Sequence, residues 1–448
     1  MAPAPRITVI GTGYLGATHA AAMAELGFEV LGLDVSAEKI AVLERGEAPM
    51  YEPGLEDLLR KHVAGHEGAS GRLRFTTSYA EAGEFGDIHF ICVNTPQRHG
   101  EYACDMSYVD SAVASLAPHL KRPALVVGKS TVPVGSAERL AAELAAAAPV
   151  GEDAELAWNP EFLREGFAVK DTLHPDRLVV GVRSQHAEDL LRTVYAQPIA
   201  EGSPFVVTDF PTAELVKTSA NSFLATKISF INAMAEVCEA ADGDVVKLAE
   251  AIGHDERIGS KFLRAGIGFG GGCLPKDIRA FMARAGELGA SEALTFLREV
   301  DSINMRRRAH IVELAREALG GSLLGKRIAV LGATFKPDSD DVRDSPALNV
   351  AGQLHLQGAQ VTVYDPKGNE NARALFPTLG YAPSALEAVR GADVVLHLTE
   401  WREFKELDPA VLGEAVARRH LLDGRNTLDP ELWRKAGWTF RALGRPRA

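Results

Sequence analysis

Cysteine is scarce in this chain of 448 residues, which holds only four: Cys92, Cys104, Cys238 and Cys273. No two of them are spaced as Cys-x-x-Cys, and no Cys or His group has the spacing of a zinc site. Such a chain is typical of a reducing compartment, where thiols stay unpaired. The scarcity therefore predicts a cytoplasmic protein without disulfides and without a bound metal.

Long apolar runs are also absent, because no segment approaches the roughly 20 apolar residues that cross a bilayer. The opening stretch, "MAPAPRITVIGTG", leads directly into a strand-like run, so no signal peptide is expected. Basic residues are the minority, with 48 Lys and Arg against 60 Asp and Glu and a net charge of −12. This acidic excess disfavours nucleic acid and anionic membranes as partners, whereas local arginines can still bind an anionic small molecule.

The composition is that of a globular protein, 46% apolar and 24% charged, in a chain too long for one core. Strands and helices alternate over residues 1–211, helices alone follow over 212–320, and alternation returns over 321–448. Alternation of this kind predicts a parallel sheet with helices on both faces. The expected fold class is therefore α/β, with two Rossmann-like, doubly wound domains joined by a central all-α region.

The central region is expected to contain one long helix from about residue 212, because "AELVKTSANSFLATKISFINAMAEVCEAA" has helical apolar spacing and no helix breaker. Strands are expected at residues 6–11, 28–34, 87–96, 124–135, 178–182, 325–335, 359–366, 391–401 and 420–426.

The first strand is followed by "GTGYLG", in which Gly11, Gly13 and Gly16 form Gly-x-Gly-x-x-Gly ahead of a helix. Gly11 permits the tight turn, Gly13 lets a pyrophosphate approach the backbone, and Gly16 lets helix and strand pack closely. Asp34 ends the next strand, where its charge would bind ribose hydroxyls and repel a 2′-phosphate. These features favour NAD over NADP, although the motif alone also suits FAD or a turn without ligand.

The stretch "GIGFGGGCLPKD" (266–277) places five glycines just before Cys273. Glycine at this density disfavours a helix or strand, so a loop is predicted. A lone thiol is most often a small buried apolar group, but glycines offer it no apolar packing, and the nearby cation of Lys276 favours a reactive thiolate. Read alone, Lys276 is a solvated lysine and Asp277 a helix N-cap. Together they favour Cys273 as a nucleophile.

This loop resembles the active-site loop of the nucleotide-sugar 6-dehydrogenases, the UDP-glucose and GDP-mannose dehydrogenase family. Other motifs resemble that family in the same order: "GTGYLG", "YEPGLEDLL", "VNTP", "STVPVG", "NPEFLREGFAVKD", "AELVKTSANSFLATKISF", "FKPDSDDVRDSP", "YDP" and "DGRN". The resemblance runs from about residue 6 to 430 and implies an NAD-dependent enzyme with a nucleotide-sugar substrate. The resemblance favours UDP-glucose as substrate, with UDP-glucuronate as product and two NAD consumed. Leu274 stands where the UDP-glucose branch often has Phe, so GDP-mannose and dTDP-glucose stay open as alternatives.

The implied reaction is a four-electron oxidation of the sugar C6 alcohol to a carboxylate. Cys273 captures the intermediate aldehyde as a thiohemiacetal, the second oxidation gives a thioester, and water releases the acid. Two other classes compete with this interpretation. A two-electron hydroxy-acid dehydrogenase shares the N-terminal fold but has no use for Cys273, and a silent NAD-binding interaction protein has no use for the set Lys217, Asn221, Cys273 and Asp277.

By resemblance, Lys217 and Asn221 stabilise a developing oxyanion; they lie four residues apart on the long helix and so share a face. Glu161 helps to activate the hydrolytic water. Read locally, Asn159 and Pro160 predict an N-cap and the first residue of a helix, with Glu161 in its first turn.

Thr131, at a strand end, is expected to join a water network with Asp277, and Glu165 to line the sugar and nicotinamide site. The full set of expected NAD contacts is Gly11, Gly13, Tyr14, Leu15, Gly16, Asp34, Lys39, Thr95, Thr131, Glu165, Lys276 and Arg343. The expected substrate contacts are Glu161, Phe162, Leu163, Glu165, Lys217, Asn221, Arg257, Phe262, Arg264, Gly270, Lys336 and Arg425.

The segment "FKPDSDDVRDSP" follows a strand but lacks the glycine motif, so the resemblance assigns the C-terminal domain to the substrate nucleotide. Lys336 and Arg425 there suit diphosphate oxygens, and Arg343 is expected to reach the cofactor. Arg257 is expected to enter a neighbouring subunit's site. Because the family forms dimers through the long helix, a homodimer or larger homo-oligomer is expected.

Overall fold

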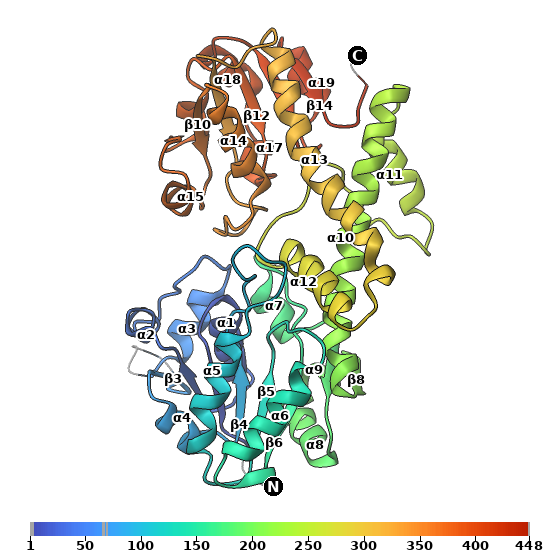
Figure 1. Ribbon diagram of the computed structural model, residues 1–448. Coiled ribbons are helices and arrows are strands. Elements are labelled where there is room, and N and C mark those ends of the chain that lie inside the picture. Colours follow the sequence, from blue (N-terminus) through green and yellow to red (C-terminus); the bar gives the residue numbers. More distant parts are fainter. Residues whose placement is uncertain (1–3, 65–67, 69, 447–448) are drawn as a thin grey trace. The chain divides into compact units, whose positions relative to one another are not determined.

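The computed structural model describes residues 4–64, 68 and 70–446 of the chain. It divides into two compact units (Figure 1). The first holds the residues up to 220 together with 279–284, and the second holds 221–278 and the residues from 285 onward. The three domains expected from the sequence, with boundaries at 211/212 and 320/321, stay a prediction.

The first unit is built on an eight-stranded sheet of order β3-β2-β1-β4-β5-β6-β7-β8. Its strands are β1 (Ile7–Ile10), β2 (Val30–Leu33), β3 (Leu73–Thr76), β4 (Ile88–Ile91), β5 (Ala124–Gly128), β6 (Ala154–Trp158), β7 (Leu178–Gly181) and β8 (Phe205–Thr208). Neighbours are parallel except β6 and β7, which pair antiparallel at Trp158 and Gly181. The strand order reverses between β1 and β4, and ligands of such sheets bind beyond the carboxyl ends of the strands at this point.

The helices of this unit cover both faces of the sheet. They are α1 (Tyr14–Glu25), α2 (Ala37–Glu44), α3 (Leu55–His62), α4 (Tyr79–Phe85), α5 (Ser107–Leu116), α6 (Ser136–Ala147), α7 (Ala168–Leu173), α8 (Gln185–Val194) and α9 (Ala196–Ala200). Successive strand residues point to opposite faces. Ile7 and Val9 therefore pack with α1 in one core, whereas Ile10 packs with α5 and α6 in the other.

A single long helix, α10 (Phe210–Ala241), begins in the first unit and continues into the second. Its start is two residues before the expected one, and Pro211 occupies the first turn, where a missing N–H is tolerated. The predicted long helix is confirmed.

The second unit contains a six-stranded, all-parallel sheet of order β11-β10-β9-β12-β13-β14. Its strands are β9 (Arg327–Leu331), β10 (Gln360–Tyr364), β11 (Gly380–Tyr381), β12 (Val394–His397), β13 (His420–Asp423) and β14 (Thr439–Ala442). Ile328 and Val330 pack against α13 (Thr295–Ala318) and α14 (Pro346–Leu356). The opposite face carries Ala329 and Leu331. The α/β fold class with two doubly wound sheets is confirmed.

The remaining helices of the chain are α11 (Val245–Gly253), α12 (Leu274–Glu287), α15 (Asn369–Leu375), α16 (Ala385–Val389), α17 (Arg402–Lys405), α18 (Pro409–Ala415) and α19 (Pro430–Lys435). Across the described residues, no helix combines the length and the apolar character needed to cross a membrane.

Candidate functional site

The glycine motif forms the turn between β1 and α1. Gly11 has a φ of +88°, and a Cβ at Gly16 would lie 1.7 Å from the carbonyl oxygen of Gly11, so only glycine fits at position 16. Above Gly13 the space is open, because a Cβ there would meet only Asn94 Oδ1, at 4.0 Å. Gly13 is also the N-cap of α1 and offers no side chain to its N–H groups. The turn therefore fits a pyrophosphate held on a helix N-terminus.

Asp34 lies beside this turn and is only 6% exposed. Its Oδ2 accepts hydrogen bonds from the backbone N–H of Thr12 at 2.9 Å and from the Thr12 hydroxyl at 3.1 Å. Its Oδ1 accepts from the Ser36 N–H at 3.0 Å, which leaves this oxygen capacity for a ribose hydroxyl. Lys39 lies 3.5 Å from Oδ2, so these two expected NAD contacts are adjacent.

Glu52, from the motif "YEPGLEDLL", holds the turn that carries Glu165. The buried carboxylate accepts from Gly166 N at 2.6 Å and from Ala168 N at 2.7 Å, at the start of α7. The hydroxyl of Tyr14 donates to Glu52 and accepts from Gly166 N at 2.8 Å. The sequence alone gives Glu52 no role, because an acid in a loop carries no local signal of a contact so far along the chain.

Lys217, which is buried, and Glu161, which is partly buried, form an ion pair in the first unit. Lys217 Nζ lies 3.1 Å from Glu161 Oε1, and the two side chains are 6% and 13% exposed. Glu161 Oε2 accepts from Leu163 N at 2.7 Å, and the Phe162 ring centroid lies 5.6 Å from Lys217 Nζ. Four expected substrate contacts are therefore brought together, with the carboxylate and the amine held in fixed orientations.

The expected helix at Asn159 and Pro160 is wrong. Residues 159–164 have no helical structure, and Asn159 caps nothing. Its buried amide donates to Val179 O at 2.8 Å and accepts from Lys129 Nζ at 3.0 Å and from the Tyr195 hydroxyl at 2.6 Å. These tertiary hydrogen bonds occupy the amide group of Asn159, which a helix N-cap would have used to bond the backbone of its own helix.

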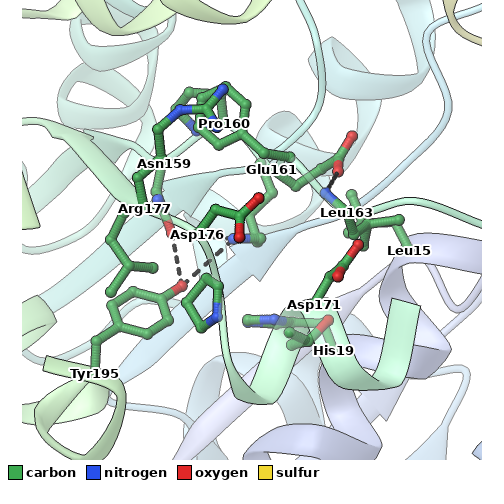
Figure 2. A pocket seen from close by; sticks show the side chains of 15 residues that line it. Leu15, His19, Asn159, Pro160, Glu161, Leu163, Asp171, Asp176, Arg177 and Tyr195 are labelled. Atoms are coloured by element: carbon green, nitrogen blue, oxygen red, sulfur yellow. Dashed lines mark hydrogen bonds between the residues drawn. The ribbon is translucent and has the colours of Figure 1, made fainter. Parts of the chain in front are cut away.

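Lys129 was not among the residues expected from the sequence. Its Nζ donates to Asn159, two residues before Glu161. It lines the cavity of Figure 2 together with Asn159, Glu161 and Tyr195. Burial is the main cause that lowers the pKa of Lys129 to about 8. Thr131 follows two residues later, and its carbonyl oxygen accepts from the Thr95 hydroxyl at 2.8 Å. Lys129 is thus a buried cation among the strand ends that carry Thr131 and Glu161.

Cys273 and Asp277 lie at the start of α12 in the second unit. The Cys273 side chain is exposed. Asp277 is 2% exposed and accepts from Asn221 Nδ2 at 2.6 Å and from Lys276 Nζ at 2.6 Å. The N-cap interpretation of Asp277 is wrong, because its own N–H donates to Cys273 O at 2.9 Å, inside the first turn of α12. Asn221, Lys276 and Asp277 form one cluster a turn away from the thiol.

Arg425 is largely, though not fully, buried and donates to backbone carbonyl groups of three segments. It donates to Leu398 O at 2.7 Å, to Gly268 O at 3.0 Å and to Phe335 O at 3.3 Å. Burial is the main cause that lowers its pKa. The guanidinium therefore ties the glycine loop to the strand ends of the second sheet, next to Lys336.

The other expected contacts of this unit are spread more widely. Arg343 packs on Gly272, where a Cβ would lie 2.5 Å from its guanidinium carbon. Arg264 lies 3.9 Å from Glu400. Phe262 has a φ of +63° and is partly exposed. The Arg257 side chain is 88% exposed and pairs with Asp255, two residues earlier in the chain. No group of metal-ligating side chains occurs among the residues that the structure describes.

Family models match three successive parts of the chain. They are the NAD binding domain of the UDP-glucose/GDP-mannose dehydrogenase family over residues 5–199, its central domain over 211–306 and its UDP binding domain over 329–430. The chain belongs to the UDP-glucose/GDP-mannose dehydrogenase family. The predicted resemblance is confirmed.

Curated relatives in this family are similar over their whole length. The chain is 40% identical to UDP-glucose 6-dehydrogenase of Rhizobium meliloti (strain 1021), over 98% of this chain and 100% of that protein. It is 39% identical to a UDP-glucose 6-dehydrogenase of Bacillus subtilis (strain 168), over 98% and 97%. The solved UDP-glucose dehydrogenase of Pyrobaculum islandicum superposes with a TM-score of 0.89 at 36% identity, over 99% and 98%.

As a member of the UDP-glucose/GDP-mannose dehydrogenase family, the chain is an NAD-dependent nucleotide-sugar 6-dehydrogenase. The turn at Gly11–Gly16 and Asp34 fit NAD by their own geometry, because the open backbone and the acidic side chain suit a pyrophosphate and an unphosphorylated ribose. The predicted cofactor is confirmed.

Proposed function

We propose that the chain oxidises UDP-glucose to UDP-glucuronate, using two NAD and one water. The curated relatives that cover nearly all of this chain carry the name UDP-glucose 6-dehydrogenase. The observation that carries the proposal is the placement of Cys273, which is exposed immediately before α12. The first turn of α12 carries Lys276 and Asp277, and Asn221 of α10 donates to the buried carboxylate of Asp277. A thiolate at that position is stabilised by the helix N-terminus and by the ammonium of Lys276.

In the first oxidation, the C6 alcohol loses a hydride and a proton and becomes an aldehyde. NAD, when bound, accepts the hydride of each oxidation. The Cys273 thiol adds to the aldehyde carbon, so a C–S bond forms and the oxygen takes a proton. This thiohemiacetal retains the aldehyde between the two oxidations, which is the advantage of a covalent nucleophile here.

In the second oxidation, the thiohemiacetal loses a hydride and a proton and becomes a thioester. Water then attacks the acyl carbon, the C–S bond breaks, and the carboxylate and the Cys273 thiol are released. We assign Glu161 to activating this water, Lys217 and Asn221 to stabilising the tetrahedral oxyanion, and Thr131 and Asp277 to ordering the water. The fixed orientation of Glu161 by Lys217 and Leu163 N supports the first assignment.

The NAD and substrate contacts given above are proposed for this reaction as well. For the substrate, Lys336 and Arg425 on the second unit supply cationic donors for the diphosphate.

GDP-mannose and dTDP-glucose are the competing substrates. A panel of nucleotide sugars, with NADH counted per sugar consumed, tests the proposal. UDP-glucose is expected to give two NADH and no aldehyde, whereas one NADH with released aldehyde would show a two-electron enzyme.

We also propose a homodimer that forms through α10. Phe223, Phe230 and Val237 recur at seven-residue intervals and are 66%, 48% and 57% exposed. Large apolar side chains in such a row are typical of an interface. In such a dimer, the exposed Arg257 is proposed to enter the neighbouring subunit's site.

The domain division at 211/212 and 320/321 is likewise proposed. The family models support it, because they leave residues 200–210 and 307–328 unmatched.

A further inference from the structure

We infer that Asn304 and Arg308 of α13 are positioning residues, which hold the Cys273 loop in its reactive geometry. The inference rests on the proposed role of Cys273. Neither side chain belongs to the expected set of NAD or substrate contacts, and both are essentially buried, at 0% and 1% exposure. One helical turn separates them, so they present their polar groups along one line of the helix.

The side-chain amide of Asn304 pairs with the backbone of the glycine loop, in the way that a neighbouring strand pairs with both polar groups of one residue. Its Oδ1 accepts from Phe269 N at 2.7 Å, and its Nδ2 donates to Phe269 O at 3.0 Å. The approach is so close that a Cβ at Gly268, whose φ is +97°, would lie 2.3 Å from Oδ1. The side-chain amide therefore fixes both polar groups of Phe269, four residues before the thiol.

Arg308 connects the same loop to the segment that follows β9. One guanidinium nitrogen, Nη2, donates to Phe269 O at 3.0 Å, and the other, Nη1, donates to Asp344 Oδ1 at 2.7 Å. Asp344 has a φ of +44°, which is an uncommon conformation for a residue with a side chain. Its carbonyl oxygen also approaches Gly270, where a Cβ would lie only 2.2 Å away. The guanidinium thus bridges two loops that touch each other.

These contacts explain why glycine is so frequent before Cys273. The loop is packed against α13 on one side and against residues 335–346 on the other, and backbone without Cβ atoms is what fits between them. The segment 335–346 carries Lys336, which we propose as a phosphate contact. A bridge between that segment and the nucleophile loop keeps the thiol at a set distance from the proposed nucleotide site, and a misplacement of about 1 Å can cost on the order of a hundredfold in rate.

Arg307 supplies a matched control, because it is the adjacent residue and is equally buried. Its guanidinium faces α10 instead, with Glu239 at 3.2 Å and Glu236 at 3.8 Å. Arg307→Lys and Arg308→Lys both perturb a buried arginine. Only Arg308→Lys removes the two-pronged donor between Phe269 and Asp344.

The test compares wild type, Arg308→Lys and Arg307→Lys in the full-length protein. Three quantities are measured: the thermal midpoint, the steady-state constants with UDP-glucose, and the rate at which iodoacetamide alkylates Cys273. The alkylation is followed by mass spectrometry of the peptide that contains Cys273. For Arg308→Lys, kcat is expected to fall at least about tenfold with little change in KM. The alkylation rate of Cys273 is expected to change severalfold. Arg307→Lys is expected to lower the thermal midpoint but to keep the wild-type alkylation rate.

If Arg308→Lys does not fold, Asn304→Ser provides a second comparison, because it removes the two bonds from Asn304 to Phe269 and leaves the bond from Arg308 to Phe269 O in place. Ethylguanidinium is expected to restore part of the activity of Arg308→Ala, which a purely structural defect would not allow. Wild-type kcat and a wild-type alkylation rate in both Arg308→Lys and Asn304→Ser would overturn the inference. Activity retained by Cys273→Ser would overturn the proposed function instead, while the alkylation measurement would still report on the loop.

Discussion

The side-chain amide of Asn221 donates to the carboxylate of Asp277 across 2.6 Å, although 56 positions separate the two residues in the chain. Asn221 comes from the middle of α10, and Asp277 from the first turn of α12. The other carboxylate oxygen accepts from Lys276. The contact fixes the first turn of α12, which begins directly after Cys273. The proposed nucleophile is therefore attached to a helix terminus whose position is held by α10.

Replacement of the thiol tests its proposed role. Cys273→Ser keeps the shape of the loop but offers a hydroxyl that is scarcely ionised near neutral pH, so turnover is expected to fall by several orders of magnitude. UDP-glucose and NAD are expected to bind with unchanged affinity by calorimetry. Cys104→Ser, at a partly exposed cysteine outside the proposed site, serves as the control. Turnover of Cys273→Ser within a factor of a few of the wild type would rule out the covalent mechanism.

Cofactor preference is expected to depend on Asp34. The wild type is expected to prefer NAD strongly, and Asp34→Ala to narrow the ratio of kcat/KM between NAD and NADP, because the charge that repels a 2′-phosphate is gone. The same variant leaves the buried N–H of Thr12 without its acceptor, which is expected to cost about 1–3 kcal/mol of stability. Equal wild-type activity with the two cofactors would contradict the role given to Asp34.

Stability is expected to depend on pH through Lys129. Burial lowers the pKa of Lys129 to about 8, so between pH 8 and the usual lysine pKa of about 10.4 the unfolded chain binds more protons than the folded one. The contribution of this residue to stability therefore rises with pH in that window and is least favourable below pH 8.

Lys129→Met removes the buried charge while Tyr195 still donates to Asn159 at 2.6 Å. The variant is expected to have the higher thermal midpoint at pH 7, and this advantage is expected to shrink steadily from pH 8 to pH 10. Calorimetric scans of both proteins over that range measure it. A difference in midpoint that does not change with pH would contradict the prediction.

Assembly is expected to respond to charge on α10. Phe223→Asp with Phe230→Asp is expected to convert the proposed dimer to monomer, because two charges would be buried without partners at the interface. Leu356→Asp changes a residue of α14 that is 86% exposed and is expected to leave the mass unchanged. Light scattering at micromolar concentration distinguishes these cases, and a monomeric wild type would contradict the dimer.

Features that depend on neighbouring residues in the chain could be predicted from the sequence. The turn at Gly11–Gly16, the α/β alternation and the long helix α10 follow from glycine spacing and apolar periodicity, which act within a few turns of backbone. The family could be predicted as well, because its motifs are short and local. Strands β3, β6, β8, β11 and β14 were missed, since runs of two to five residues carry little periodic signal.

The buried polar contacts were decided by the tertiary structure. Asn159 has the local signature of a helix cap, yet it bonds to Lys129, Tyr195 and Val179 because the strands that carry them are neighbours in space. Asn304 and Arg308 read as ordinary helix residues, and only the packing of α13 on the Cys273 loop gives them Phe269 as a partner. A buried polar group must find a partner wherever the fold places one, and that choice depends on residues that the local sequence does not contain.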